Sequence, residues 1–358
     1  MLKKLILLFV FNFSLNSLSA LEKTPQTLIE TIRDFINVSK PSRMIGLPGH
    51  EKATQFIEQK IKTIDKQSSS RFIRQDFIPN ISIAQKLYQS DLEQFQKQGS
   101  PNLILLEKNK RFTSHMIQYL DKMKDQKGTN LIWMKPGTSK KWIIVTTHFD
   151  TISHDKETLM IKQNEATPGA DYNGSGVSIA LALIDEFKDL KNEVGLMIVF
   201  FDYSTLGFLG AHHFLEQNEK SLFNVDDVKL NIHLTMLGYD SKGLDEEKKM
   251  GNMKAYLSST KTPKGKMEWN FFNQLVKNQP KNNSFYFESL DNDFNQSDHV
   301  RFWEKGIPSI VLSQNWEKDF NHRNYQTPND LPEFLNAQTL YDELRWLVQG
   351  LRPLLLHL

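Results

Sequence analysis

Hydrophobic positions in the first part of the chain follow a helical spacing. Apolar residues recur at that spacing from Thr27 to Ile64, and the Pro- and Gly-containing stretch SKPSRMIGLPGHEK (39–52) interrupts them. The pattern predicts two helices joined by a loop. Residues 80–128 are polar and charged, and we expect a helical insertion there. Three roles are open for this insertion: a solvent-exposed addition to the fold, a cover over a pocket, or a binding surface for a partner.

From residue 140 onward, strand-like and helix-like segments alternate. The runs KKWIIVTTHFD (140–150) and VGLMIVFFD (194–202) read as strands, and GVSIALALIDEF (176–187) between them reads as a helix. The alternation continues through LGFLGAHHFLEQ, KLNIHLTMLGY, KAYLSS, MEWNFFNQLVKN, SDHVRFWEKG and IPSIVLS. It predicts an α/β fold of three layers, with a mostly parallel central sheet and helices on both faces. We expect the apolar helix at 340–358 to dock on this sheet.

Polar residues follow three of the predicted strands. They are found in HFD (148–150), FFDYST (200–205) and LTMLGYD (234–240). In open α/β sheets, ligands bind at the carboxyl ends of the strands. The sequence therefore predicts a pocket at these strand ends.

The N-terminus has the pattern of a secretory signal peptide. Two lysines precede an apolar run from Leu5 to Leu15, and the small residues Ser17, Ser19 and Ala20 follow. We expect a signal peptide at 1–20 and a single domain at 21–358, exported to the periplasm or secreted. An uncleaved anchor is the alternative, but the run is short for a membrane span. We predict no membrane span after cleavage.

Charge and cysteine content narrow the possible functions. The 358 residues contain 44 basic and 42 acidic side chains, and removal of the two leader lysines makes the chain formally neutral. Neutrality argues against nucleic acid or anionic membranes as partners. The sequence has no cysteine, which excludes disulfides, zinc thiolate sites and a catalytic thiol.

Seven segments in order resemble the landmarks of one known family. They are RMIGLPGHEKATQFIEQKI, THFDT, PGADYNGSGVSIALAL, FFDYSTLGFLGAHHF, MLGYD, SDHVRFWEKGIPSIVL and YQTPND. Together they resemble the co-catalytic, di-zinc aminopeptidases and their glutaminyl cyclase relatives. That resemblance implies two zinc ions about 3.5 to 4 Å apart, a bridging water and a carboxylate that moves its proton.

Only the first of the implied zinc ligands is present. The resemblance places a ligand at His148 and expects Asp150 to orient it. The aspartate that bridges both metals in relatives belongs to a GADDNGSG-like loop. Here the loop reads GADYNGSG, so Tyr172 stands at the ligand position and Asp171 lies one residue early.

The other implied functional positions carry neutral side chains. Ser204 replaces the glutamate that acts as general base, and Thr205 replaces the neighbouring glutamate ligand. Thr235 stands at an aspartate position and Gln326 at a histidine position. Hydroxyls and amides are neither carboxylate bases near neutral pH nor anionic zinc ligands.

We therefore predict a non-catalytic family member without a metal or other cofactor, which binds a peptide or protein partner or acts as a scaffold. In one form of this hypothesis, Tyr172 fills the former metal volume and points into it. The alternative is an active zinc aminopeptidase or glutaminyl cyclase with an unorthodox metal site.

A relocated metal site would use five residues, His148, Asp171, Asp202, His233 and His322. His233 lies two positions before Thr235, which displaces a ligand by about 6.5 Å along a strand. A zinc–ligand bond near 2 Å does not absorb that shift, so we predict no bound zinc.

Asp171, Asp202, His233 and Tyr325 remain candidates for lining a cleft. We expect Ser297 to cap a helix and Asp298 to favour the dipole of that helix, rather than to face the pocket.

Overall fold

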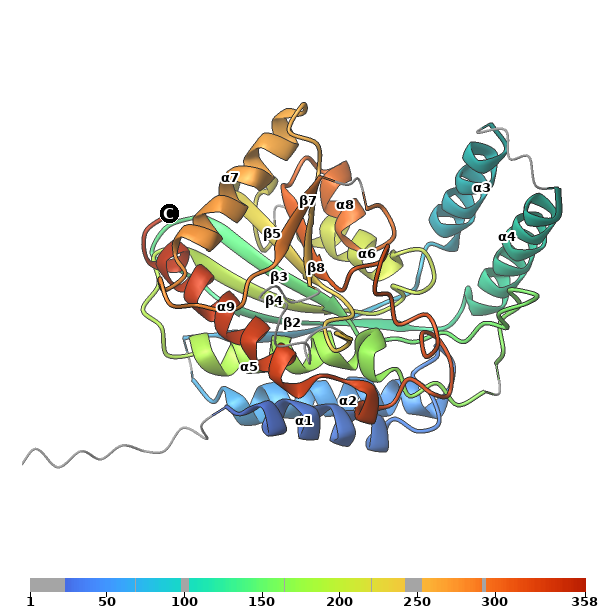
Figure 1. The fold of residues 1–358 in the computed structure, drawn as a ribbon, viewed down its shortest axis with the longest axis horizontal. Helices are drawn as coiled ribbons and strands as arrows, with labels where there is room; N and C mark the ends of the chain where they lie inside the picture. Colours follow the sequence, from blue (N-terminus) through green and yellow to red (C-terminus); the bar gives the residue numbers. More distant parts are fainter. Residues whose placement is uncertain are drawn as a thin grey trace, which may run out of the picture.

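The computed structural model describes residues 23–67, 69–97, 103–163, 165–219, 221–241, 253–291 and 294–358. The predicted signal peptide at 1–20 lies outside these ranges. Figure 1 shows a central sheet between layers of helices, with a helical pair that projects from one side.

One sheet of eight strands runs through the described part of the chain, in the order β1-β2-β4-β3-β5-β8-β6-β7. The strands are β1 (Arg71–Phe77), β2 (Gly128–Lys135), β3 (Trp142–His148), β4 (Gly195–Phe201), β5 (Val228–Leu234), β6 (Lys254–Leu257), β7 (Glu288–Asp291) and β8 (Ser309–Ser313). Strands β4, β3, β5 and β8 are parallel and form the centre. The pairs β1–β2, β2–β4 and β6–β8 are antiparallel, so the sheet is mixed around a parallel core.

Helices cover both faces of the sheet, which confirms the predicted three-layer α/β class. One face carries α1 (Pro25–Val38), α2 (Pro48–Ile64), α5 (Ser175–Phe187), α7 (Pro263–Lys277) and α9 (Ala337–Leu356). The other carries α6 (Leu209–Asn218) and α8 (His299–Glu304). Three short helical turns lie at Ala170–Gly174, Val225–Asp227 and Pro332–Phe334.

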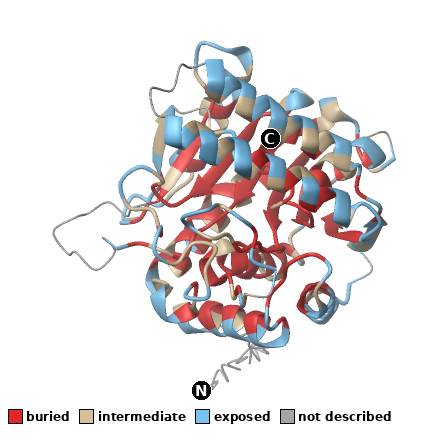
Figure 2. Ribbon diagram, turned by 90° about the vertical axis from the view of Figure 1, so that its right-hand side faces the viewer, coloured by how far each residue is buried: buried red, intermediate tan, exposed pale blue. Residues whose placement is uncertain are grey.

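Alternate residues of each central strand enter opposite layers of the core. Ile143 and Val145 of β3 belong to the apolar cluster under α5 and α9, whereas Ile144 belongs to the cluster under α6 and α8. Because both faces are covered, the central strands read as nearly continuous apolar runs. Figure 2 shows these strands buried between the helices. The C-terminal helix α9 docks on the first face, as its apolar spacing predicts.

Two helices occupy the polar region before β2. They are α3 (Ile81–Lys97) and α4 (Leu103–Met123), which extend together from the body of the molecule (Figure 1). Only the base of this α3–α4 hairpin is deeply buried, where Ala84 and Met116 pack near Tyr203. Nowhere in the described ranges is there a helix with the length and hydrophobicity needed to cross a bilayer.

The loop between β3 and α5 is held by a buried ionic framework. The Asp330 carboxylate accepts the backbone N–H groups of Asp171 and Tyr172, at 2.9 and 3.0 Å. The Arg43 guanidinium donates to the carbonyl oxygen of Gly169 at 2.9 Å. Gly169 has a φ of +62°, and a side chain there would collide with Arg43. Loop, strand and helix are thereby fixed relative to one another.

Two buried acids in this framework interact. Burial raises the pKa of Asp330 to about 7, and the nearby charge of Asp171 adds to the rise while Arg43 opposes it. Burial raises the pKa of Asp171 to about 6, although donors from Asn321 and Gly238 lower it. Both carboxyls are therefore costly to ionise in the folded protein.

The raised pKa of Asp330 predicts a pH dependence of stability. In the unfolded chain an aspartate titrates near pH 4, so this contribution is complete below about pH 4 and is lost as the pH rises through about 7. We expect the stability advantage of the wild type over Asp330→Asn to shrink by about 2 to 4 kcal/mol between about pH 4.5 and about pH 8. Urea unfolding of both proteins at several pH values measures this difference in the free energy of unfolding.

The matched control for this titration is Asp226→Asn, because Asp226 is exposed. Its stability curve should stay parallel to that of the wild type over the whole range. A parallel curve for Asp330→Asn as well would contradict the assignment of this pH dependence to Asp330.

Candidate functional site

The predicted site residues lie at the carboxyl ends of the parallel strands. His148 is the last residue of β3, Ser204 and Thr205 follow β4, and Thr235 follows β5 directly. Because β3 pairs with both β4 and β5, these strand ends lie side by side. The loop that carries Tyr172 connects β3 to α5 at the same end.

Both carboxylate oxygens of Asp150 accept hydrogen bonds from the loop after β4. One of its oxygens accepts the Ser204 N–H at 3.1 Å, and the other accepts the N–H and hydroxyl of Thr205 at 2.9 and 2.6 Å. Burial opposes the charge on Asp150, but the adjacent His148 ring and the Thr205 donors hold its pKa below the ordinary value. The expected orienting hydrogen bond is not formed, because His148 Nδ1 lies 3.7 Å from the carboxylate.

The hydroxyl of Ser204, at the position of the general base, also forms a hydrogen bond within the protein. It donates to Asp298 at 2.6 Å. Burial raises the pKa of Asp298 to about 6, while the nearby His148 ring and the Ser204 hydroxyl act in the opposite direction. The second carboxylate oxygen of Asp298 has no hydrogen-bond partner within the described ranges.

The predicted capping role of Ser297 is wrong, and so is the expectation that Asp298 does not face the pocket. Helix α8 begins at His299 without a side-chain hydrogen bond from its cap residue. Ser297 instead shares a 2.6 Å hydrogen bond with His233 Nε2, and Asp298 turns inward to Ser204. The segment SDHVRF does not distinguish a pocket from the start of a helix, because Ser and Asp are common at both kinds of position.

Tyr172 points into the site, as the plug hypothesis expects. Its half-buried ring meets the His148 ring edge-on, with centroids 4.8 Å apart. On its other side lies the ring of Tyr325, also at 4.8 Å. Burial and the neighbouring Tyr325 raise the pKa of Tyr172 well above the ordinary value, so the phenol stays neutral. The Tyr172 ring therefore stands at the position where relatives are expected to hold a bridging carboxylate, between the rings of His148 and Tyr325.

Gln326 belongs to the wall of the site. Its amide oxygen accepts a hydrogen bond from His154 Nδ1 at 2.9 Å, and its amide nitrogen donates to the Tyr325 hydroxyl at 3.0 Å. The Phe112 ring of α4 packs near His154. Tyr88 of α3 donates to the Thr205 carbonyl at 3.3 Å, so the base of the α3–α4 hairpin borders the site.

The sequence did not predict that Tyr88, Phe112 and His154 border the site. The first two lie on the helical insertion and the third in a loop, where no spacing signal connects them to the strand ends. Folding alone brings them there.

Three predicted cleft residues lie within the buried hydrogen-bond network. Both ring nitrogens of His233 are used, by Thr146 at 3.0 Å and by Ser297. Burial, with the neighbouring His299, lowers the pKa of His233 well below its ordinary value. Asp202 binds His50 Nε2 at 2.8 Å, and Asp171 accepts from Gly238 N at 2.8 Å. The cleft assignment is therefore corrected for these three residues, and for Tyr325 it stays a prediction.

The donor set does not fit a pair of zinc ions. Of the implied ligands only His148 is a usual zinc ligand, and His322 lies in an exposed loop segment. Over the described residues, no cluster of three or more His, Cys, Asp and Glu side chains is arranged to hold a metal ion.

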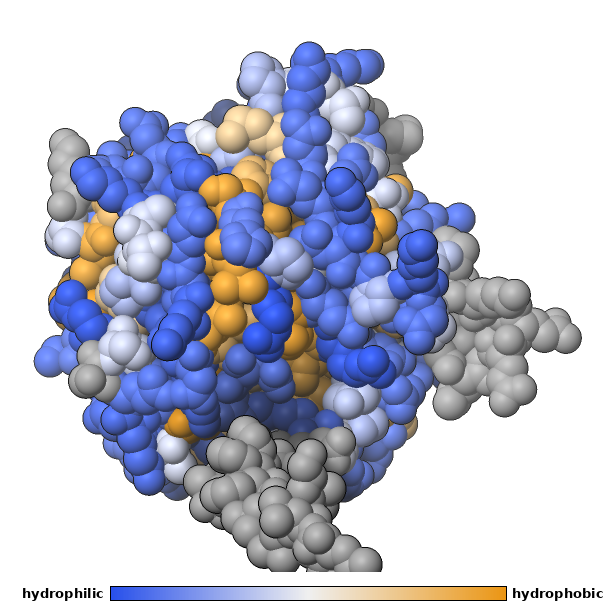
Figure 3. All heavy atoms as spheres, turned by 90° about the vertical axis from the view of Figure 1, so that its left-hand side faces the viewer, coloured by the Kyte–Doolittle hydropathy of each residue, from blue (hydrophilic) through white to orange (hydrophobic). Residues whose placement is uncertain are grey.

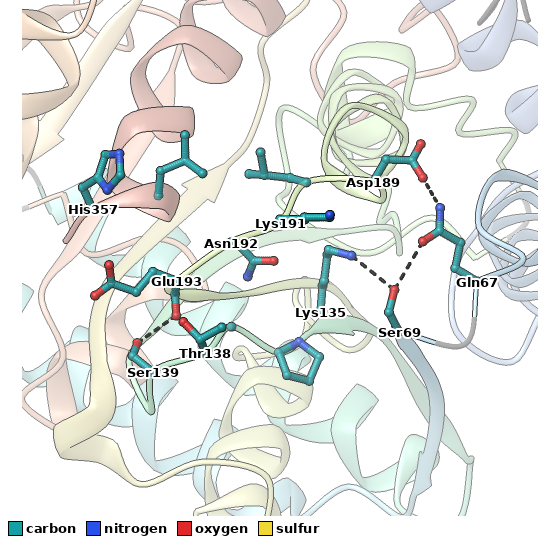
Figure 4. Close-up of a pocket in the computed structure, with 14 residues that line it drawn as sticks. Gln67, Ser69, Lys135, Thr138, Ser139, Asp189, Lys191, Asn192, Glu193 and His357 are labelled. Atoms are coloured by element: carbon teal, nitrogen blue, oxygen red, sulfur yellow. Dashed lines mark hydrogen bonds between the residues drawn. The ribbon is translucent and has the colours of Figure 1, made fainter.

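A separate hollow of about 950 Å³ lies at the opposite ends of the strands. Figure 4 shows its polar lining, which includes Lys135, Asp189 and Glu193. Lys135 donates to the Lys188 carbonyl at 2.7 Å and to Ser69 at 3.3 Å. Figure 3 shows the face on this side, with hydrophobic residues in the middle and hydrophilic residues around them. This hollow is distinct from the strand-end site.

Comparison with known proteins agrees with the fold. The chain is 22% identical to aminopeptidase YwaD of Bacillus subtilis over 222 residues, which are 60% of this chain and 42% of that protein. A B. subtilis zinc aminopeptidase structure matches 93% of this chain and 96% of its own, with a TM-score of 0.63 and 16% identity. An Acidobacteriales bacterium glutaminyl cyclase matches 93% and 94%, with a TM-score of 0.62 and 16% identity.

The family model of peptidase family M28 matches residues 130–347, which is more than half of the chain. These residues run from β2 into α9 and include every strand end of the site. The resemblance to zinc aminopeptidases and glutaminyl cyclases is thereby confirmed, and the chain belongs to peptidase family M28.

Proposed function

We propose that this M28 protein is catalytically inactive and acts as a binding or scaffold protein, exported to the periplasm or secreted after loss of residues 1–20. The observation that carries the proposal is the Tyr172 ring packed between His148 and Tyr325. An aromatic ring at the bridging position takes up the volume that two metal ions and their water require.

The chemistry of the neighbouring residues supports the same conclusion. A neutral hydroxyl does not remove a proton from water near neutral pH, and that of Ser204 already donates to Asp298. Thr205 is likewise bound to Asp150. Without a base or a metal to polarise the carbonyl, neither peptide hydrolysis nor cyclisation has its usual means of acceleration.

We propose that the strand ends bind a peptide end or a related small molecule. Among the residues gathered there are the half-buried aromatic side chains of Tyr88, Phe112, Tyr172 and Tyr325. Rings with a polar hydroxyl provide apolar contact area together with hydrogen bonds, a combination common in peptide-binding surfaces.

The alternative, an active enzyme with an unorthodox site, has one observation in its favour. Asp298 is buried next to Ser204 and has an oxygen without a hydrogen-bond partner in the described structure. With a pKa raised to about 6, this carboxylate could accept a proton. Any activity of the wild type that Asp298→Asn abolishes would support this alternative.

Metal content and activity test the proposal directly. After equilibration with a small excess of zinc and removal of the unbound ion, we expect fewer than about 0.2 zinc ions per protein by elemental analysis, because the ligands are missing. Aminoacyl p-nitroanilides and peptides with N-terminal glutamine should remain unchanged. About two bound zinc ions with chelator-sensitive turnover would overturn the proposal.

Restoring the ligands should restore the metal. The variant with Tyr172→Asp, Ser204→Glu, Thr205→Glu, Thr235→Asp and Gln326→His should bind between one and two zinc ions, because the strand ends keep the family arrangement. Its matched control carries the other four changes but retains Tyr172, and should bind at least about ten-fold more weakly. Equal zinc affinity in the two variants would show that the ring does not occupy the metal volume.

A further inference from the structure

A loop that follows β3 lies between the α3–α4 hairpin and the wall of the strand-end site. It comprises residues 153–162 and is closed by an antiparallel bridge between His154 and Ile161. Within it, the Asp155 N–H donates to the Met160 carbonyl at 2.8 Å. Hydrogen bonds inside the 153–162 loop therefore hold its shape.

On one side, the 153–162 loop is bound to the segment that carries Gln326. The Lys156 ammonium donates to the carbonyl oxygens of His322 and Arg323, at 2.7 and 2.9 Å. His154 Nδ1 shares a 2.9 Å hydrogen bond with the amide oxygen of Gln326. These hydrogen bonds attach the loop to the wall of the strand-end site.

On the other side, the loop contacts α4 through His115. The backbone N–H of Ile161 donates to His115 Nε2 at 3.1 Å. The Ile161 side chain is buried in the same apolar cluster as Met116, the next residue of α4. One turn earlier on α4, the Phe112 ring packs near the His154 ring, with centroids 5.6 Å apart. The contact between α4 and the loop therefore combines apolar packing with a hydrogen bond to a histidine.

The hydrogen bond between Ile161 and His115 requires one protonation state of the imidazole. A backbone N–H can only donate, so His115 Nε2 must carry a lone pair and no proton. A proton on Nε2 places two N–H groups against each other and leaves the N–H of the buried Ile161 without this acceptor. A buried donor without an acceptor destabilises the structure around it. The contact therefore exists only while His115 is neutral.

The surroundings of both histidines favour their neutral forms. Burial and the charge of Lys122 lower the pKa of His115 below its ordinary value. Burial also lowers the pKa of His154, where the hydrogen bond to Gln326 opposes this effect and the neighbouring His115 adds to it. Near neutral pH both rings are therefore uncharged, and each gains a charge only in acid.

The ionisable groups that the loop, α4 and α3 place around this contact keep their charge state between about pH 5 and about pH 8. On the loop, Asp155 pairs with Lys162 at 3.5 Å, and hydrogen bonds from Thr158 lower the pKa of Asp155 to about 2. On α4, Arg111 lies one turn before His115. On α3, burial raises the pKa of the Tyr88 phenol. Acidification within this range therefore changes the charge of the two histidines.

We propose that the hydrogen bond between His115 and Ile161 is a pH-dependent contact, which holds the 153–162 loop on the α3–α4 hairpin near neutral pH and releases it in mildly acidic medium. The loop stays attached to the segment around Gln326, so release separates the hairpin from the site wall at this point. Phe112 and His154, which border the strand-end site, meet at the same place. The contact contains no implied zinc ligand or general base, so it is independent of whether the strand ends are catalytic.

Hydrogen exchange of the Ile161 amide tests the proposal. The full chain is labelled with nitrogen-15 isoleucine, and each exchange rate is compared with that of an unprotected amide at the same pH, so that the intrinsic pH dependence of exchange cancels. We expect the protection of Ile161 to fall at least about ten-fold between about pH 7.5 and about pH 5. The amide of Ile144 in β3 should not lose protection, which distinguishes local release from global unfolding.

Two variants identify the group that titrates. His115→Gln retains an acceptor, because the amide oxygen of glutamine can take the place of Nε2, and it has no titratable ring. Its Ile161 amide should have the same protection at both pH values. The matched control His357→Gln makes the same change at an exposed position outside the hairpin, and it should follow the wild type.

Circular dichroism at both pH values verifies that each variant is folded. The proposal is overturned if Ile161 of the wild type keeps its protection in acid, or if His115→Gln loses protection as the wild type does. The second result would assign the pH dependence to another group, with His154 as the next to replace. Zinc content and turnover, which test the proposed function, are measured separately and do not depend on either result.

Discussion

The arrangement of the strand-end site depends on the two backbone hydrogen bonds that Asp330 accepts from Asp171 and Tyr172. They fix the direction of the loop after β3, and Arg43 fixes its start at Gly169. With the backbone held in this way, the side chain at position 172 is directed at His148. A carboxylate there could reach a metal, whereas the tyrosine places its ring beside the histidine.

The residues that hold the loops of the site in place are therefore different from the residues at the expected metal positions. The acids that shape the loops, Asp150, Asp171 and Asp330, all accept backbone or side-chain donors and remain buried. The positions expected to hold metals carry hydroxyl, phenol and amide groups instead, most of which hydrogen-bond to neighbouring protein groups. In a buried site, polar groups that satisfy one another stabilise the structure without a metal.

Much of the fold could be predicted from the sequence, because strand and helix periodicities differ and the central strands are continuous apolar runs. The sequence also located the strand ends and the position of Tyr172. It could not show the direction of Asp298, because Ser and Asp before a helix fit a cap as well as a pocket. Nor could it connect Tyr88 and Phe112 to the site, since these contacts join segments far apart in the chain.

A crystal structure of the protein soaked in zinc, with anomalous data collected at the zinc edge, shows whether the Tyr172 ring excludes zinc from the strand ends. We expect the Tyr172 ring in clear density between His148 and Tyr325, with no anomalous peak at the strand ends. One or two strong peaks about 2 Å from the His148 ring nitrogen, with the tyrosine displaced, would contradict this expectation.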